Sequence, residues 1–166
     1  HSHSNKYPTG SKQQEVTCCG LNNDDDWFII APPHGCKDPV AATCPCCPRL
    51  VASGCAIRLV HWKTGNCLHS HGHAALVSDG QFEVTCFKEP GAGNAEDDWR
   101  VHFDQGDAGE IRFEHAMFKG FLHSHPASYP AGTMQQEVTR FPGKDHNDLW
   151  TVADVVLPSA ASLGFA

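Results

Sequence analysis

The sequence predicts an all-β fold built from three repeats, and three observations support this prediction. The tripeptide HSH occurs three times, at residues 1–3, 69–71 and 123–125. A segment Q-x-E-V-T follows twelve residues after each first histidine, beginning at Gln13, Gln81 and Gln135. Each unit then closes with a polar loop and a tryptophan, at Trp27, Trp99 and Trp150. Because independent segments recur at a fixed spacing, we interpret the chain as an internal three-fold repeat.

Each repeat is predicted to contain four short strands. Residues 57–61 (IRLVH) and 82–87 (FEVTCF) alternate apolar and polar side chains, which is typical of half-buried strands. Turns rich in Gly, Asn, Pro and Asp separate the strands, as at residues 7–12 and 63–66. The third repeat has a matching first strand at residues 111–115 (IRFEH), and no long amphipathic helix is predicted.

Three four-stranded units around a pseudo-three-fold axis form a β-trefoil, whereas a propeller needs about four or more blades. We expect one domain over residues 1–166, with repeats at 1–30, 55–104 and 109–157. A Cys/Pro-rich insertion is expected at residues 31–54. The first repeat has no counterpart of residues 57–61, so its first strand is expected to be absent from this chain.

Composition excludes several classes of function. Of the 166 residues, 40% are hydrophobic and 19% charged, which is typical of a globular chain. The formal net charge of −7 and the lack of a Lys/Arg cluster argue against nucleic acid and anionic membranes as partners. No apolar run approaches the roughly 18 residues of a membrane-spanning helix.

The repeated histidines are candidates for metal ligands, for glycan or partner contacts, or for hydrogen bonds that the fold needs. The candidates are His69, His71, His123 and His125. Because residues i and i+2 of a strand share a face, both histidines of each pair are expected to point outward, with the preceding leucine inward. The copies would lie on separate repeats, away from one tetrahedral site. We therefore expect fold-determining histidines and no metal site.

The Q-x-E-V-T segments offer a second set of candidates, which is Gln81, Glu83, Gln135 and Glu137. Structural hydrogen bonds and glycan contacts both remain open for them. The tryptophans Trp27, Trp99 and Trp150 are expected in the core because they occupy equivalent positions. Trp62 has no such counterpart, since Ala116 takes its place in the third repeat, and is a candidate for an exposed contact.

Catalytic and zinc motifs are missing. The sequence has no G-x-S-x-G, H-E-x-x-H, P-loop or G-x-G-x-x-G motif, so we expect no enzyme. Five of the nine cysteines lie within residues 36–55, without the paired C-x2-C spacing of a zinc ribbon. Cysteine-rich loops in a compact domain favour disulfides and an oxidising compartment.

The combination of LHSH, QQEVT and a D-x-N-x-x-W closing turn resembles the MIR domain. That family includes protein O-mannosyltransferases, inositol-trisphosphate and ryanodine receptors, and small soluble endoplasmic-reticulum proteins. The resemblance covers nearly the whole chain and is greatest to the stromal-cell-derived-factor-two-like proteins, notably at residues 89–99 and 122–138. The spacing of Cys47 and Cys55 matches a pair in some members, which implies a disulfide. The first residues are also similar to the mannosyltransferase version.

The resemblance implies a non-enzymatic protein of the endoplasmic-reticulum lumen, without a cofactor. It would act in protein quality control and the unfolded-protein response, with a J-domain co-chaperone and lumenal Hsp70, on misfolded or O-mannosylated clients. One alternative is the lumenal MIR domain of a protein O-mannosyltransferase. Another is a trefoil carbohydrate-binding module, which depends on fold analogy.

Overall fold

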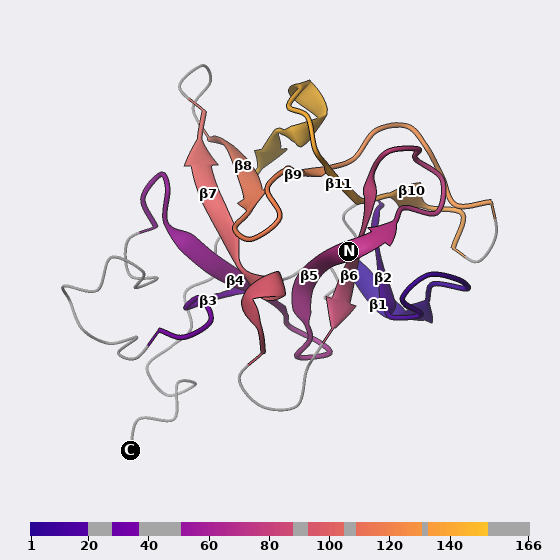
Figure 1. Ribbon diagram of the computed structural model, residues 1–166, viewed down its shortest axis with the longest axis horizontal. Coiled ribbons are helices and arrows are strands. Elements are labelled where there is room, and N and C mark those ends of the chain that lie inside the picture. The colour runs from indigo at the N-terminus through magenta and orange to yellow at the C-terminus, as the bar shows by residue number, and fades with distance from the viewer. Residues whose placement is uncertain (20–27, 37–50, 88–92, 105–108, 131–132, 153–166) are drawn as a thin grey trace.

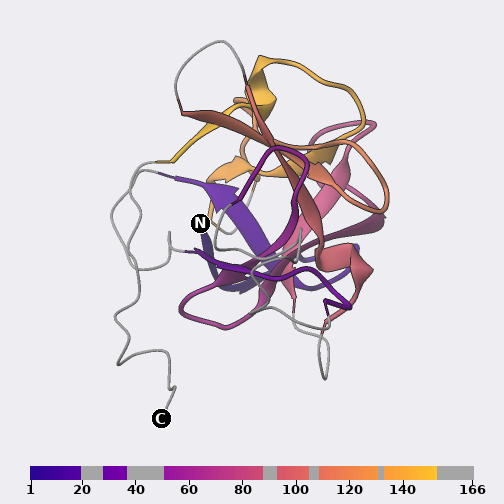
Figure 2. The same cartoon turned by 90° about the vertical axis from the view of Figure 1, so that its left-hand side faces the viewer.

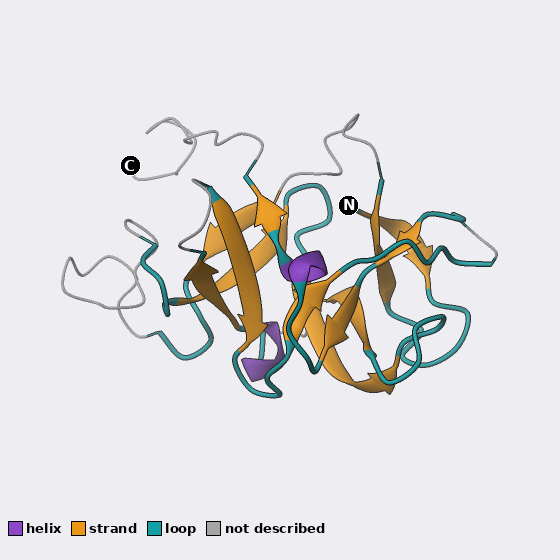
Figure 3. Cartoon of the chain, turned by 90° about the horizontal axis from the view of Figure 1, so that it is seen from above, coloured by secondary structure: helices purple, strands orange, loops and turns teal. Residues whose placement is uncertain are grey.

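The computed structural model of the chain describes residues 1–19, 28–36, 51–87, 93–104, 109–130 and 133–152. Strands make up nearly all of the regular structure in Figure 3, so the all-β prediction is confirmed. The described helices are single turns of three residues, Ala95–Asp97 (η2) and His146–Asp148 (η3). No helix in these residues is both long and apolar enough to cross a membrane.

Twelve strands are described, and three of them coincide with the strands predicted at residues 57–61, 82–87 and 111–115. The first six are β1 (Ser2–Lys6), β2 (Gln14–Cys18), β3 (Phe28–Ala31), β4 (Ala56–His61), β5 (Cys67–Ala74) and β6 (Phe82–Phe87). The other six are β7 (Trp99–Phe103), β8 (Glu110–His115), β9 (Phe121–His123), β10 (Gln136–Glu137), β11 (Thr139–Phe141) and β12 (Trp150–Thr151).

The strands form a barrel-like antiparallel sheet. Successive pairings run β6-β11-β9-β8-β7-β4-β5 and return to β6, so that this circuit closes on itself. In Figure 1, β1, β2, β5 and β6 lie on one side of the molecule, and β3, β4, β7 and β8 on the other. In Figure 2 the third repeat, coloured orange and yellow, forms the upper part of the molecule and lies above the indigo and violet strands. Segments far apart in sequence are therefore direct neighbours.

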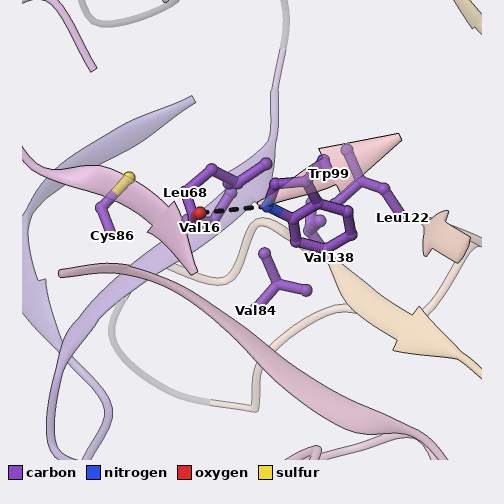
Figure 4. Packing of buried hydrophobic residues seen from close by; sticks show 7 residues of the cluster. All are labelled: Val16, Leu68, Val84, Cys86, Trp99, Leu122 and Val138. Carbon is purple, nitrogen blue, oxygen red and sulfur yellow. Dashed lines mark hydrogen bonds between the residues drawn. The ribbon is translucent and has the colours of Figure 1, made fainter. Parts of the chain in front are cut away.

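The core draws on all three repeated segments. It contains the valines of the three Q-x-E-V-T segments, the leucines of both LHSH segments, one cysteine and one tryptophan: Val16, Val84, Val138, Leu68, Leu122, Cys86 and Trp99. The indole N–H of Trp99 donates to the carbonyl oxygen of Leu68 at 3.0 Å (Figure 4). Each Val or Leu side chain removed from water contributes about 1.5–3 kcal/mol. The repeated apolar positions thus form one shared core.

The tryptophan positions are only partly equivalent. Trp99 is fully buried and its ring lies 4.9 Å from that of His115. Trp150 is partly buried and its N–H donates to the Leu122 carbonyl oxygen at 2.9 Å. Trp27 lies outside the described residues. The next residue, Phe28, pairs with His61 and places its ring 5.3 Å from the imidazole. A phenylalanine therefore makes the contact that Trp99 makes in the second repeat.

Replacing Trp99 with alanine removes a fully buried side chain and its hydrogen bond to Leu68. We expect the free energy of unfolding to fall by about 3–5 kcal/mol. The matched control is Trp62→Ala, because Trp62 is 63% exposed and should change stability by less than about 0.5 kcal/mol. Denaturant unfolding followed by fluorescence of the remaining tryptophans measures both. Equal losses in the two variants would contradict the burial of Trp99.

Candidate functional site

The serine of each HSH segment ties its strand to the Q-x-E-V-T strand of the same repeat. In every copy the hydroxyl donates to the backbone carbonyl oxygen of the glutamate thirteen residues later. The three bonds are Ser2 to Glu15 (3.0 Å), Ser70 to Glu83 (2.8 Å) and Ser124 to Glu137 (2.8 Å). The fixed spacing between the two segments therefore reflects one hydrogen bond that the fold makes three times.

The first histidine of HSH binds the closing loop of its repeat. His69 Nδ1 lies 2.9 Å from Asp97 Oδ1 in η2, and His123 Nδ1 lies 2.8 Å from Asp148 Oδ1 in η3. Both aspartates also cap their helical turns, because their second oxygen accepts the N–H of the N-cap residue. Each stands two residues before a tryptophan, as Asp25 does in the first repeat. These partners were not predicted from the sequence, although their repeated position before the tryptophan could have identified them.

The predicted outward orientation of the histidine pairs is wrong. His69, His71 and His123 are buried, with exposures of 2%, 7% and 2%. The turns η2 and η3 contact the first histidine of each pair, so the face opposite the leucine is covered as well. Strand alternation predicts which residues share a face, but it does not reveal a second layer over that face.

The second histidines differ between repeats. His125 Nδ1 lies 3.0 Å from His123 Nε2. His71 instead accepts the backbone N–H of His73 at Nδ1. The buried His71 Nε2 has no hydrogen-bond partner and lies 3.7 Å from the Glu83 carboxylate. Burial lowers the pKa of His71 to about 4, with His69 and the Arg140 guanidinium adding repulsion. His71 is therefore neutral near pH 7.

The glutamates of Q-x-E-V-T cap turns of other repeats. The Glu137 carboxylate accepts the backbone N–H groups of Val77 and Ser78, both at 3.0 Å, and the Ser78 hydroxyl at 2.6 Å. The Glu83 carboxylate accepts the N–H of Ser11 at 3.2 Å and fills the space beside Gly10. Because Gly10 has a φ of +62°, a larger residue there would be strained and would meet this carboxylate. Both glutamates are thus engaged in joining repeats.

Glutamine and threonine side chains complete a cycle between the three repeats. In each link a threonine hydroxyl donates to the side-chain oxygen of the first glutamine of another Q-x-E-V-T segment. The links are Thr17 to Gln135 (2.6 Å), Thr85 to Gln13 (2.7 Å) and Thr139 to Gln81. All three threonines are at most 1% exposed. The predicted glycan candidates Gln81 and Gln135 therefore already have structural partners.

One set of described side chains could hold a metal ion. Ligand atoms of His123, Asp145 and Asp148 lie within 4.8 Å of one another. Asp145 Oδ1 accepts the N–H of Asn147, and Asp148 accepts both His123 and the N–H of Asp145. These bonds place all three side chains in the cap of η3.

The thiol of Cys86 is not an activated nucleophile. Cys86 is 1% exposed, and burial raises the pKa of its thiol to about 12. A thiol held in its protonated form is a poor nucleophile. Cys47 lies outside the described residues, so its predicted disulfide with Cys55 stays a prediction. Trp62, by contrast, is 63% exposed.

Comparisons with known proteins agree with this geometry. The MIR domain family model matches residues 1–117. The Stromal cell-derived factor 2-like protein of Arabidopsis thaliana is 34% identical over 95% of this chain and 72% of its own length. The crystal structure of the SDF2-like protein from Arabidopsis thaliana has a TM-score of 0.79 and 34% identity, covering 95% of this chain and 87% of that chain.

A second kind of relative is much longer. The Dolichyl-phosphate-mannose--protein mannosyltransferase 1 of Saccharomyces cerevisiae is 34% identical over 172 residues, covering 92% of this chain. The match spans only 20% of the transferase. Similarity to this chain is therefore confined to one part of that protein.

The threonine–glutamine cycle predicts three equal mutational effects. Thr17→Val, Thr85→Val and Thr139→Val each keep the side-chain shape but leave a glutamine oxygen without its donor. We expect each to lower the free energy of unfolding by about 1–3 kcal/mol. Thr9→Val, at an exposed turn position, is the control. Equilibrium denaturation measures the stability of all four variants. A near-zero effect at one buried threonine would show that the three links are not equivalent.

The buried histidines predict a loss of stability in acid. Burial lowers the pKa values of His71 and His115 from 6.5 to about 4. As the pH falls from about 6.5 to 4, these two imidazoles bind protons in the unfolded chain but not in the folded chain. The free energy of unfolding should therefore fall by up to about 1.4 kcal/mol per pH unit for each histidine.

Denaturant unfolding at several pH values measures this slope. Burial raises the pKa values of Glu15 and Asp98, which acts in the opposite direction, so the slope is compared with that of His115→Gln. The variant should lose the contribution of His115. A wild-type His115 ring that titrates near pH 6.5 by NMR would contradict the prediction.

Proposed function

This chain belongs to the MIR domain family, and from that premise we propose that it is a non-enzymatic binding module of the endoplasmic-reticulum lumen. It acts in protein quality control together with a J-domain co-chaperone and lumenal Hsp70. Its clients are misfolded or O-mannosylated proteins. The observation that carries this proposal is the 34% identity to a stromal cell-derived factor 2-like protein along 95% of the chain.

The hydrogen-bond network supports binding in preference to catalysis. The repeated histidines, glutamates and glutamines are engaged with each other, with closing loops or with turns of other repeats. An active site needs a nucleophile or base that a substrate can reach. The side chains of His69 and His123 are only 3% exposed and are engaged with Asp97 and Asp148. These groups therefore serve the fold, and partners are bound elsewhere.

We also propose that the sheet is a β-trefoil of repeats 1–30, 55–104 and 109–157, with an insertion at 31–54. Equivalent bonds support it, such as those from the indoles of Trp99 and Trp150 to the leucines of LHSH. In the described residues β7 lies between β4 and β8, whereas its counterpart β3 pairs with β4 alone. This difference is consistent with a first repeat that lacks its first strand.

Trp62 is the proposed partner contact. It begins the turn after β4, and its indole is 63% exposed. The third repeat has Ala116 at this position, so the tryptophan is not needed to build a repeat. Tryptophan is enriched among the residues that dominate protein interfaces. An exposed tryptophan at a position where the repeats differ is therefore the partner contact that we propose.

A second candidate is the MIR module of a protein O-mannosyltransferase. The observation that favours it is the 34% identity to the yeast transferase over 92% of this chain. In that case the chain binds substrate or regulates, and catalysis belongs to another part of a longer protein. The length of the natural gene product decides between the two, because this chain matches only 20% of the yeast transferase.

The quality-control proposal predicts recovery of specific partners. The immobilised chain should retain a J-domain protein and Hsp70 from a lumenal extract, and Trp62→Ala should weaken binding about 30-fold, as for a loss of about 2 kcal/mol. Met134→Ala is the control, because Met134 is similarly exposed on a different turn. Mass spectrometry and titration with the purified partners provide the readout. Recovery of neither partner by the wild-type chain would contradict the proposal.

A further inference from the structure

The turn at residues 75–80 is connected to the third repeat by a line of polar side chains. Ser78 is 6% exposed, and its hydroxyl donates to Glu137 at 2.6 Å. On its other side the same hydroxyl faces His125 Nε2 at 3.5 Å. His125 Nδ1 then meets His123 Nε2 at 3.0 Å, and His123 Nδ1 meets Asp148 at 2.8 Å. Five side chains from separate elements thus form one continuous series.

The available protons can be counted along this series. The Asp148 carboxylate accepts, so His123 carries its proton on Nδ1 and accepts at Nε2. His125 must then donate from Nδ1, which leaves a lone pair on its Nε2. Ser78 has one hydroxyl proton, and the 2.6 Å bond to Glu137 uses it. With neutral imidazoles, the contact between His125 and Ser78 therefore holds no proton, and it is also the longest in the series.

We propose that His125 is a proton-operated latch, which on taking up one proton at Nε2 bonds the Ser78 hydroxyl and fastens the turn at residues 75–80 to the third repeat. The proton comes from solvent, and no other bond in the series has to change. The new bond has a cationic donor, which makes it stronger than a neutral one. Closing of the turn therefore becomes more favourable as the pH falls.

The charges around His125 suit this role. Within the described residues, the titratable groups that face it are His123 and, behind Ser78, the carboxylate of Glu137. Asp148 and Asp145 lie behind His123, at 2.8 Å and 3.7 Å from its Nδ1. Asp145 and Asp148 thus lie within 3.7 Å of the His123 ring, and Glu137 is bonded to the hydroxyl that His125 faces. An added positive charge is compensated on both sides of the latch.

The junction between the first and second repeats provides an internal control. Gly10 takes the place of Ser78 there, so no hydroxyl stands beside the Glu83 carboxylate. His69 Nε2 faces Glu96 at 3.4 Å and not the second histidine. His71 already carries its proton on Nε2, because its Nδ1 accepts the N–H of His73. This junction has the equivalent residues Glu83 and His71, but no line of hydrogen-bonding side chains connects them through a hydroxyl. It should therefore lack the latch.

Imidazole NMR tests the proton count directly. At about pH 8, two-bond proton–nitrogen spectra should show His123 and His125 with the proton on Nδ1, and acid should add a proton to His125 Nε2. Finding His125 with its proton on Nε2 at about pH 8 would overturn the proposal, because the latch would already be closed.

Hydrogen exchange tests the consequence for the turn. The N–H groups of Val77 and Ser78 both donate to Glu137, so their opening reports on the latch. After correction for intrinsic rates, their opening constants should fall roughly three- to tenfold between about pH 7.5 and 5.5. The N–H of Ser11, bound to Glu83 at the control junction, should show no such fall.

Two variants remove the latch, and one keeps it. Ser78→Ala deletes the hydroxyl and His125→Asn deletes the titrating ring, so each should abolish the pH dependence. His73→Asn, at an exposed histidine, should retain it. If Ser78→Ala does not fold, His125→Asn alone decides, since it leaves the bond between Ser78 and Glu137 in place. A pH dependence that persists in His125→Asn, or is missing from the wild type, rejects the latch.

Discussion

Hydrogen bonds that run from one repeat to another are the constraint on which the rest of this structure depends. Each buried threonine of the Q-x-E-V-T segments finds its acceptor on a glutamine of a different segment. A buried hydroxyl without an acceptor costs about 1–3 kcal/mol. A repeat cut from the chain would carry such orphaned groups at every junction. The three segments therefore have to fold as one unit, and most of their stabilising contacts are distant in sequence.

The same constraint separates structural residues from those free to bind partners. The side chains that are most alike among the repeats, such as Ser70 and Ser124, form hydrogen bonds within the fold. At one turn position the repeats differ, with Trp62 in the second repeat and Ala116 in the third. Similarity among repeats therefore reports on architecture here.

Much of the fold could be predicted because its determinants are local and periodic. Alternation with a period of two located β4 and β6, and the spacing of HSH from Q-x-E-V-T reflects the bond between Ser70 and Glu83. Distances along a chain can carry that information. The sequence also indicated that Trp62 stands apart, since its counterpart is a small residue.

The candidate site was less predictable, because its geometry depends on layers and on neighbouring repeats. The histidines are buried under η2 and η3, which strand alternation does not reveal. Asp97 and Asp148 were missed as their partners, although both stand two residues before a tryptophan. Across the junction Ser78 faces His125, whereas Gly10 stands at the equivalent position of the first repeat. The contact between Ser78 and His125 joins residues 47 positions apart.

Native-state hydrogen exchange in increasing denaturant most directly tests whether the repeats form one cooperative unit. Amides of β2, β6 and β11 come from three different repeats but share the threonine–glutamine cycle. If the repeats fold as one unit, the slowest amides of all three strands exchange with one free energy and one denaturant dependence, equal to those of global unfolding. If one strand opens at a clearly lower free energy while the other two stay protected, the repeats are independent and the account is wrong.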